Sequence, residues 1–95
     1  MIFDWDSNKN SENIEKHGIE FEQAQEVFVD PLHLSILDKR FSYFEERWIT
    51  MGTTATGKVI VVAHQYFVEE PEERIRPISA RNATPIERRQ YEKIE

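Results

Sequence analysis

The sequence predicts a small α+β domain in which an N-terminal strand and two helices precede an antiparallel β-meander and a C-terminal helix. Apolar residues recur at helical spacing before residue 30 and alternate with a period of two from residue 32 onward. A strong helix-start signal then follows the last alternating segment. A chain of 95 residues can bury one hydrophobic core and needs no second domain. We therefore expect residues 1–95 to form a single domain.

The first elements are a short strand and a helix. Ile2-Phe-Asp-Trp5 is an apolar and aromatic run that is typical of a strand. Asp6 or Ser7 then offers a side-chain oxygen to the free amides of a helix that should run to about Lys16. Gly18 occupies the position of a left-handed helix stop, so the helix is expected to end there.

A second helix is expected near Phe21 to Val29. Phe21, Ala24, Val27 and Phe28 recur on one face of it, and Asp30-Pro31 marks its end. The N-cap would be Glu20 or Ile19, and neither is a favoured capping residue. The start of this helix is therefore the boundary that the sequence defines least well.

Four strands are expected in the second half of the chain. They are Leu32 to Leu37, Arg47 to Met51, Val59 to Phe67 and Arg74 to Ser79. A glycine-bounded turn, Gly52 to Gly57, joins the second strand to the third, and an acidic, proline-containing tip, Val68 to Glu73, joins the third to the fourth. Successive strands with short connections predict an antiparallel meander.

The last helix has the clearest start. Thr84 is a favourable N-cap, Pro85 suits the first helical position, and Glu87 is placed to complete a capping box with Thr84. The sequence therefore predicts a helix from Pro85 onward.

The charge of the chain is unevenly distributed. The net charge is −6, from 12 Lys and Arg residues against 18 Asp and Glu residues. Half of the basic residues lie in residues 74–95, beside only three acidic ones. This pattern argues against binding of long duplex DNA by the chain alone and favours a local anion site. The acidic first half is suited to a basic partner.

Several classes of function are disfavoured by what the sequence lacks. The chain has no cysteine, which removes disulfides and thiolate chemistry and fits a reducing compartment. No N-terminal signal region and no apolar run of about 18 residues is present, so we expect a soluble, cytoplasmic protein. The three histidines lack metal-ligand spacing, so we expect neither a metal site nor a cofactor.

The third and fourth strands carry the residues with the most chemistry. If the tip from Val68 to Glu72 is symmetric, His64 faces Arg76 and Tyr66 faces Arg74. A slip of one residue would invert which side chains meet. We therefore predict two groups of side chains rather than exact pairs. The first group is His64, Tyr66, Arg74 and Arg76, and the second is Ser79 and Arg81. Arg47 on the preceding strand joins one group or the other.

Such a group suits cleavage of RNA without a metal. The reaction removes a proton from the 2′-hydroxyl, neutralises a charged phosphorane and protonates the leaving oxygen. A guanidinium binds two phosphate oxygens at once, and a histidine titrates near neutrality. His64 beside Arg76 would suit both needs, with Lys16 or His17 from the first helix as additions. The alternatives are a half-buried packing role for His64 and weak surface pairs for the arginines. Lys16 and His17 could equally serve as favourable charge at a helix end.

The order and spacing of several short segments resemble the BrnT family, the ribonuclease half of type II toxin-antitoxin pairs. The likeness covers nearly the whole chain. It rests on these segments: Phe3-Asp-Trp-Asp6, Lys16-His-Gly18, Phe21-Glu-Gln-Ala24, Val27-Phe28, Asp30-Pro31, Glu45-Glu-Arg-Trp-Ile-Thr-Met-Gly52, the Val-rich strand ending in His64, and Arg74-Ile-Arg-Pro-Ile-Ser-Ala-Arg81 leading to Thr84 and Glu87.

The resemblance implies a fold of the RelE and barnase-like ribonuclease group and metal-independent RNA cleavage that inhibits translation. It also implies neutralisation by a BrnA-type antitoxin, operator DNA binding only through that antitoxin, and a heterotetramer with it. The expected catalytic residues are His64 or His17 as proton shuttle, Arg76 and Arg81 as phosphate clamps, and Arg47 as support. Lys16 and Arg74 are the expected substrate-binding residues.

The chain departs from the family pattern at two places, and its acidic balance and the packing alternative for its histidines leave a second function open. Pro77 removes a backbone donor where family strands usually carry an aliphatic residue, so its strand should be at an edge or bulged there. The hairpin from Gln65 to Glu73 is long and acidic, which would repel RNA if it covered the site. The alternative is a noncatalytic module that only binds an antitoxin.

Overall fold

The computed structural model describes residues 1–40 and 46–93. Within them the chain forms an α+β domain of three helices and five strands, which confirms the predicted fold class. Glu45, part of one motif quoted above, lies outside the described residues. In chain order the elements are β1 (Ile2–Phe3), α1 (Ser7–His17), α2 (Phe21–Val27), β2 (Leu34–Leu37), β3 (Arg47–Thr53), β4 (Val59–Glu69), β5 (Glu72–Asn82) and α3 (Pro85–Glu92).

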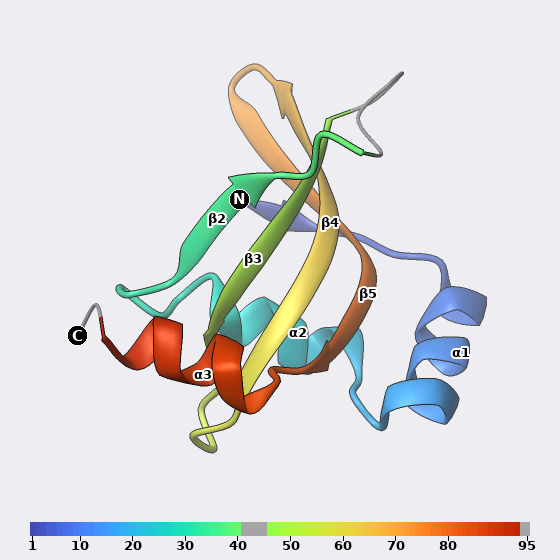
Figure 1. Ribbon diagram of the computed structural model, residues 1–95. Helices are drawn as coiled ribbons and strands as arrows, with labels where there is room; N and C mark the ends of the chain where they lie inside the picture. The colour runs from blue at the N-terminus through green and yellow to red at the C-terminus, as the bar shows by residue number, and fades with distance from the viewer. Residues whose placement is uncertain (41–45, 94–95) are drawn as a thin grey trace.

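The five strands form one sheet in the order β1-β5-β4-β3-β2. Strands β2 to β5 pair with their neighbours in antiparallel fashion, which confirms the predicted meander. The short β1 adds to the outer edge of β5 in parallel. Figure 1 shows that the β4–β5 hairpin projects beyond the helices.

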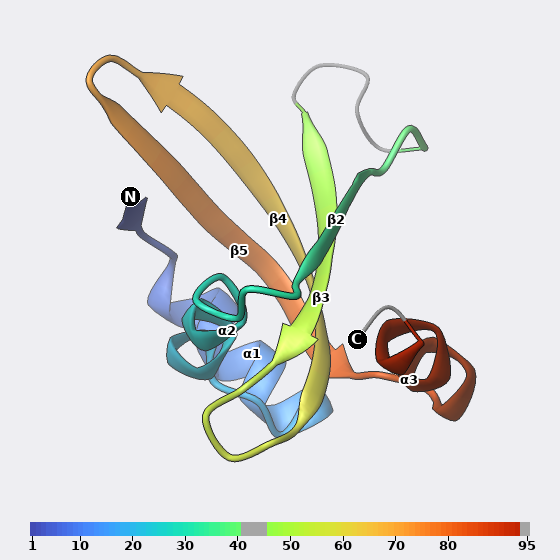
Figure 2. The same ribbon diagram turned by 90° about the vertical axis from the view of Figure 1, so that its left-hand side faces the viewer.

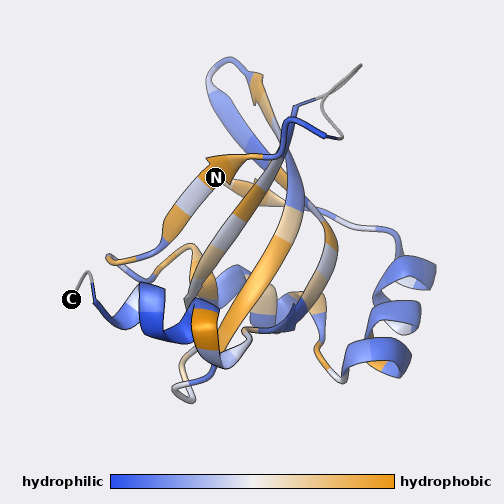
Figure 3. Cartoon of the chain, in the orientation of Figure 1, coloured by the Kyte–Doolittle hydropathy of each residue, from blue (hydrophilic) through white to orange (hydrophobic). Residues whose placement is uncertain are grey.

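The two faces of the sheet are covered differently. Helices α1 and α2 lie on one side of the sheet and α3 lies on the other (Figure 2). The core is on the side of α2, where this helix packs against β4 and β5, and the middle of β4 is correspondingly hydrophobic (Figure 3). Burial of each large side chain there contributes about 1.5 to 3 kcal/mol. The core residues are Ile19, Phe21, Ala24, Val27, Ile60, Val62 and Ala80.

Helix α1 has the predicted boundaries and also binds the first turn of α2. Asp6 accepts a hydrogen bond from the Asn8 amide at 2.8 Å, and Gly18 ends the helix with φ 71°. The side chain of Asn10 accepts from the Phe21 amide at 2.8 Å. This contact from α1 satisfies an amide in the first turn of α2, beside the capping box in which the Glu20 amide donates to the Gln23 side chain at 3.1 Å.

Helix α2 is shorter than expected. It ends at Val27 rather than Val29, and the Val29 side chain is 82% exposed. The chain turns there because the carboxylate of Asp30 accepts hydrogen bonds from the amides of Leu32 and Thr53. Strand β2 accordingly begins at Leu34 rather than Leu32.

Asn13 extends the hydrogen bonding of β5 beyond the end of β1. Its side-chain amide donates to the carbonyls of Ile19 and Ala80 at 2.8 and 2.9 Å, and its oxygen accepts from the Ala80 amide at 3.0 Å. The side chain is buried, and it occupies the place that a neighbouring strand would have. Asn13 therefore fixes α1 against the edge of β5.

The register of the β4–β5 hairpin differs from the prediction. Both strands continue to Glu69 and Glu72, so only two residues form the turn. The symmetric five-residue tip predicted from the sequence was therefore wrong, and the centre of the hairpin lies half a residue further along the chain than predicted. Gln65 therefore faces Arg76, and His64 faces Pro77.

Pro77 lies at the irregular position that the sequence predicts for it. The register shifts between Ala63 and His64, so that β5 carries one extra residue, Ile78, in a bulge. Strand β1 pairs only with Arg74 and Ile75, so Pro77 has no β1 residue beside it. A proline is tolerated there because its missing amide has no ladder partner to bond.

The C-terminal helix starts as predicted and packs on the face opposite α2. The side chain of Thr84 accepts from the Glu87 amide at 3.2 Å, and that of Glu87 accepts from the Thr84 amide at 2.9 Å. The buried Tyr91 hydrogen-bonds through its hydroxyl to Asp30 and Thr53. Among the described helices, none is long and apolar enough to cross a membrane.

Candidate functional site

The sheet presents its arginines on one face, which we call the open face: the side opposite α2. Cross-strand partners share a face, and side chains alternate along each strand. Arg47 pairs with Gln65, and Gln65 pairs with Arg76, so these three side chains form one row across three strands. Because Ile78 is an extra residue in β5, the side chains of Ser79 and Arg81 lie on the same face as those of Arg74 and Arg76. The predicted residues on the open face are Arg47, Arg74, Arg76 and Arg81.

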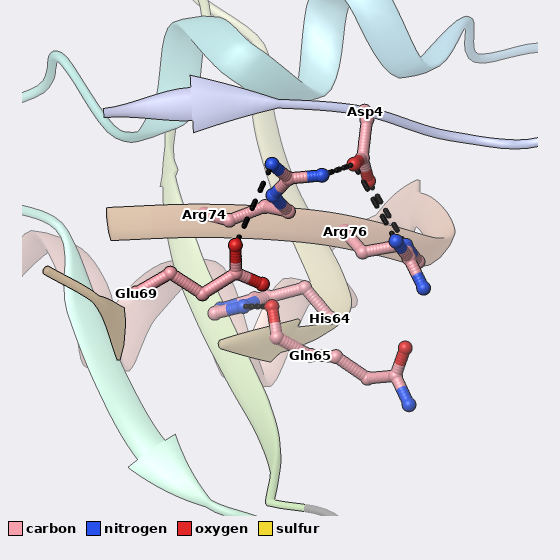
Figure 4. A network of polar contacts seen from close by, with 6 residues as sticks. All are labelled: Asp4, His64, Gln65, Glu69, Arg74 and Arg76. Carbon is pink, nitrogen blue, oxygen red and sulfur yellow. Dashed lines mark hydrogen bonds and ion pairs between the residues drawn. The ribbon is translucent and has the colours of Figure 1, made fainter. Parts of the chain in front are cut away.

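Asp4 holds two of these arginines (Figure 4). Its carboxylate lies 2.7 Å from Nη1 of Arg74 and 2.9 Å from Nε of Arg76. The hydrogen bond from Arg76 is the main cause that lowers the pKa of Asp4. The guanidinium of Arg76 also lies over the ring of Phe67, 5.3 Å from its centroid. Arg76 thus has a defined orientation although its side chain is 47% exposed.

Arg81 is held at the other end of β5. Its two terminal nitrogens donate to the carboxylate of Glu87 at 2.7 and 3.0 Å. This fork lowers the pKa of Glu87 to about 2 and raises that of Arg81. The pair fastens α3 to β5, so Arg81 has a structural contact in addition to any role in binding.

A groove runs between α1 and β5 along the edge of the open face, and we call it the α1–β5 groove. One part has a volume of about 490 Å³ and is lined by Trp5, Gln65 and Arg76. The other has a volume of about 270 Å³ and is lined by Lys16, His17 and Ser79. Lys9 and Ile78 line both parts, so the two parts adjoin each other.

The groove has a mixed charge. Its cationic side chains are Lys9, Lys16 and Arg76, and its carboxylates are Asp4, Asp6 and Glu12. Asp4 is neutralised by two arginines, and Asp6 caps α1. Because Arg76 is itself paired with Asp4, an anion in the groove would share this guanidinium with Asp4 and would also meet Lys9 and Lys16.

His64 lies on the other face of the sheet, so its predicted meeting with Arg76 is wrong. The side chain is buried, with 3% of it exposed, and its ring packs edge-on against Phe28 at 4.9 Å. Nε2 is 2.7 Å from the Thr50 hydroxyl, and Nδ1 is 3.3 Å from the Gln65 carbonyl. Burial lowers the pKa of His64 to about 4. At neutral pH it is an uncharged residue of the core.

The structure thus divides the predicted site residues into three sets. Arg47, Arg74, Arg76 and Arg81 share the open face, Lys16 and His17 line the adjoining groove, and His64 is separated from both. Sequence reasoning missed four residues of this region. They are Asp4, Trp5, Lys9 and Gln65, none of which was predicted as a site residue. The helical spacing of Lys9, Lys16 and His17 on α1 was the signal that could have found Lys9.

These groups can bind and neutralise phosphate. Arginine forks and lysine ammonium groups on one side of a groove match the oxygens of a phosphodiester. His17 is the histidine that borders the groove, at the C-terminal end of α1. Over residues 1–40 and 46–93, the structure contains no cluster of three or more acidic or histidine side chains able to hold a metal ion.

A small α+β domain with arginines beside an open groove is a domain suited to anionic, phosphate-bearing ligands. The family model described as "ribonuclease toxin, BrnT, of type II toxin-antitoxin system" matches residues 5–87. That range spans most of the chain, and the protein belongs to the BrnT family of ribonuclease toxins.

A solved structure supports the fold. The crystal structure of the Brucella abortus ribonuclease toxin BrnT, determined at 1.1 Å resolution, superimposes with a TM-score of 0.62. The two chains are 24% identical, and the match covers 88% of this chain and 99% of the other. A search among curated proteins finds no match.

Proposed function

We propose that this protein is an endoribonuclease toxin that cleaves RNA without a metal ion and thereby inhibits translation. Membership of the BrnT family supports the class of activity. The observation that carries the proposal is the position of Arg76, which borders the α1–β5 groove and belongs to the arginine row of the open face. A phosphodiester in the groove would meet a guanidinium whose direction is already fixed by Asp4.

Arg76 is the proposed phosphate clamp. Its guanidinium would neutralise the charge that builds on the phosphorane, since a preorganised cation stabilises that state more than the substrate. Arg47 lies in the same cross-strand row and would support it, while Arg81 and Arg74 would contact neighbouring phosphates. Lys16 would bind the RNA backbone from α1.

His17 is the proposed proton shuttle. It borders the part of the groove that also contains Ser79, and a histidine can take a proton from the 2′-hydroxyl or give one to the leaving oxygen. His64 is not proposed for this role, because it is buried on the opposite face. Trp5 would stack against an unpaired base at the other end of the groove.

The proposal includes a partner and a location. The toxin of a type II pair requires an antitoxin, and we propose a BrnA-type protein that neutralises this chain in a heterotetramer in the cytoplasm. Because the net charge of this chain is −6, operator DNA would be bound only through the antitoxin.

Two experiments test the proposed function. Induction of this chain alone should stop growth and protein synthesis, and co-expression of the small protein encoded by the adjoining reading frame should restore both. Purified protein should cut RNA in EDTA. Intact RNA in EDTA together with unimpaired growth on induction would refute the proposal.

The second candidate is a noncatalytic module that binds an antitoxin. One observation favours it: Arg74, Arg76 and Arg81 are all bonded to carboxylates of the protein itself. This candidate predicts tight binding to the neighbour's product without any cleavage of RNA.

A further inference from the structure

A second depression lies on the α2 face of the sheet, away from the α1–β5 groove. Its volume is about 220 Å³, and we call it the Trp48 pocket. Most of its lining is aromatic or aliphatic. The residues used below are Phe28, Trp48, His64, Tyr66, Glu73 and Ile75.

Two aromatic side chains of neighbouring strands line this pocket together. Trp48 of β3 pairs with His64 of β4, and Tyr66 follows His64 by two residues on the same face. Leu37 of β2 pairs with Trp48 on its other side and is 37% exposed. The pocket is therefore bordered by ring faces and by aliphatic surface that another protein chain could cover.

Two carboxylates stand at the rim. Glu46 accepts a hydrogen bond from the indole nitrogen of Trp48 at 3.3 Å. Glu73 lines the pocket beside Tyr66, whose pKa is raised by desolvation and by this carboxylate. Each carboxylate thus lies beside an aromatic ring. A carboxylate and an aromatic ring together attract the long side chains of arginine and lysine, which have an aliphatic part and a cationic end.

The imidazole of His64 on the floor of the pocket carries no opposing charge, while His33 and the N-terminal residue Met1 also line the pocket. The ring of His64 is bonded to Thr50, whose hydroxyl is 2.6 Å from that of Ser35. This chain of hydroxyl groups satisfies the imidazole from within the protein. A neutral imidazole does not repel a cation, whereas Glu46 and Glu73 at the rim would repel the phosphates of RNA.

We propose that the Trp48 pocket receives an arginine or lysine side chain of the antitoxin. The inference rests on the proposed function for the identity of this partner. Charge complementarity selects it, since the chain has a net charge of −6, Glu73 lines the pocket and Glu46 is bonded to the indole of Trp48. A second copy of this chain would bring the same negative charge and is disfavoured.

The position of the pocket separates the two activities. It lies on the α2 face, and the arginine row lies on the open face. Loss of the pocket contact should therefore weaken capture by the antitoxin without changing the rate of RNA cleavage. A contact at the catalytic groove would impair both.

The first test neutralises the rim. The double variant E46Q/E73Q should bind the co-purified antitoxin at least about tenfold more weakly than the wild type and should show a smaller loss of affinity with added salt. The control E15Q/E72Q changes the net charge equally at two exposed positions outside the pocket and should stay within about twofold. RNA cleavage should be the same in all three proteins. Wild-type affinity and salt dependence in E46Q/E73Q would overturn the proposal.

The second test needs no antitoxin. The chain has two tryptophans, whose indole NMR signals can be assigned with W5F and W48F variants. Acetyl-arginine amide should shift the Trp48 signal and leave the Trp5 signal unchanged, and its neutral analogue acetyl-citrulline amide should shift neither. An unresponsive Trp48 signal would contradict a cation site. If Trp48 responds but the protein neither cuts RNA nor binds the neighbour's product, the proposed function fails while the cation site stands.

Discussion

The carboxylate of Asp4 accepts a hydrogen bond from Nε of Arg76 at 2.9 Å across 72 residues of sequence. The same carboxylate binds Arg74, so one N-terminal side chain orders two guanidinium groups on β5. Strand β1 makes this possible because its parallel pairing with β5 ends at Phe3 and Ile75, next to both partners.

Replacement of Asp4 by asparagine should impair catalysis more than stability. The amide cannot neutralise two arginines, so Arg76 loses the orientation that the phosphate clamp requires. We expect RNA cleavage to fall about tenfold and the free energy of unfolding to fall by no more than about 1 kcal/mol, since both ion pairs are partly exposed. The control D6N changes a neighbouring carboxylate that accepts a hydrogen bond from the Asn8 amide. Equal losses in both variants would show that Asp4 has no special role.

The buried His64 should make the protein less stable in mild acid. Its pKa is about 4 in the folded protein against 6.5 ordinarily, so the unfolded chain binds more protons between these values. The contribution of the neutral His64 to the free energy of unfolding is complete above pH 6.5 and is lost as the pH falls towards 4. Between about pH 7 and about pH 5 the wild type should lose about 2 kcal/mol from this residue. Denaturant unfolding of the wild type and H64Q at both pH values measures the difference. An equal loss in H64Q would contradict the assignment.

Asn13 should be required for folding. Its removal leaves the amide and carbonyl of Ala80 and the carbonyl of Ile19 without these bonds. Because each buried polar group left unpaired costs about 1 to 3 kcal/mol, N13A should lower the free energy of unfolding by about 3 kcal/mol or more. Asn8 lies on the same helix with an exposed side chain, so N8A is the matched control and should change stability little. Thermal unfolding of both variants gives the comparison.

Glu87 should contribute to stability only above strongly acidic pH. Its pKa falls from 4.5 to about 2 because Arg81 and the N-terminus of α3 bind the charged form. Its contribution is therefore present above pH 4.5 and disappears as the pH falls towards about 2. The free energy of unfolding of E87Q should be about 1 kcal/mol lower than that of the wild type at neutral pH, and the difference should be smaller near pH 2. The control E92Q should show no such change with pH. An unchanged E87Q–wild-type difference across this range would refute the prediction.

Much of the fold could be predicted because local chemistry determines it. Gly18 and the capping box of Thr84 and Glu87 act within a few residues, and both were identified correctly. The start of α2 at Phe21 was also predicted correctly, but the capping box of Glu20 and Gln23 and the bond from the Phe21 amide to Asn10 of another helix were not. Contacts between elements have no local signature in the sequence.

The site was less predictable for a related reason. One residue of turn length decides which face each strand residue occupies, and the two-residue turn moved His64 away from Arg76. The charge pattern drew attention to the strand of Arg74 and Arg76, but it did not reveal Lys9 and Trp5 in the groove. That groove exists only after α1 packs beside β5.

RNA cleavage in EDTA by two variants tests most directly whether the open face, rather than the buried histidine, performs the reaction. R76A removes the guanidinium that borders the groove, and H64Q alters a residue on the opposite face. We expect R76A to lose at least about 100-fold in cleavage rate and H64Q to stay within about threefold of the wild type at neutral pH, where it remains folded. Full activity in folded R76A together with loss of activity in folded H64Q would contradict the proposed site.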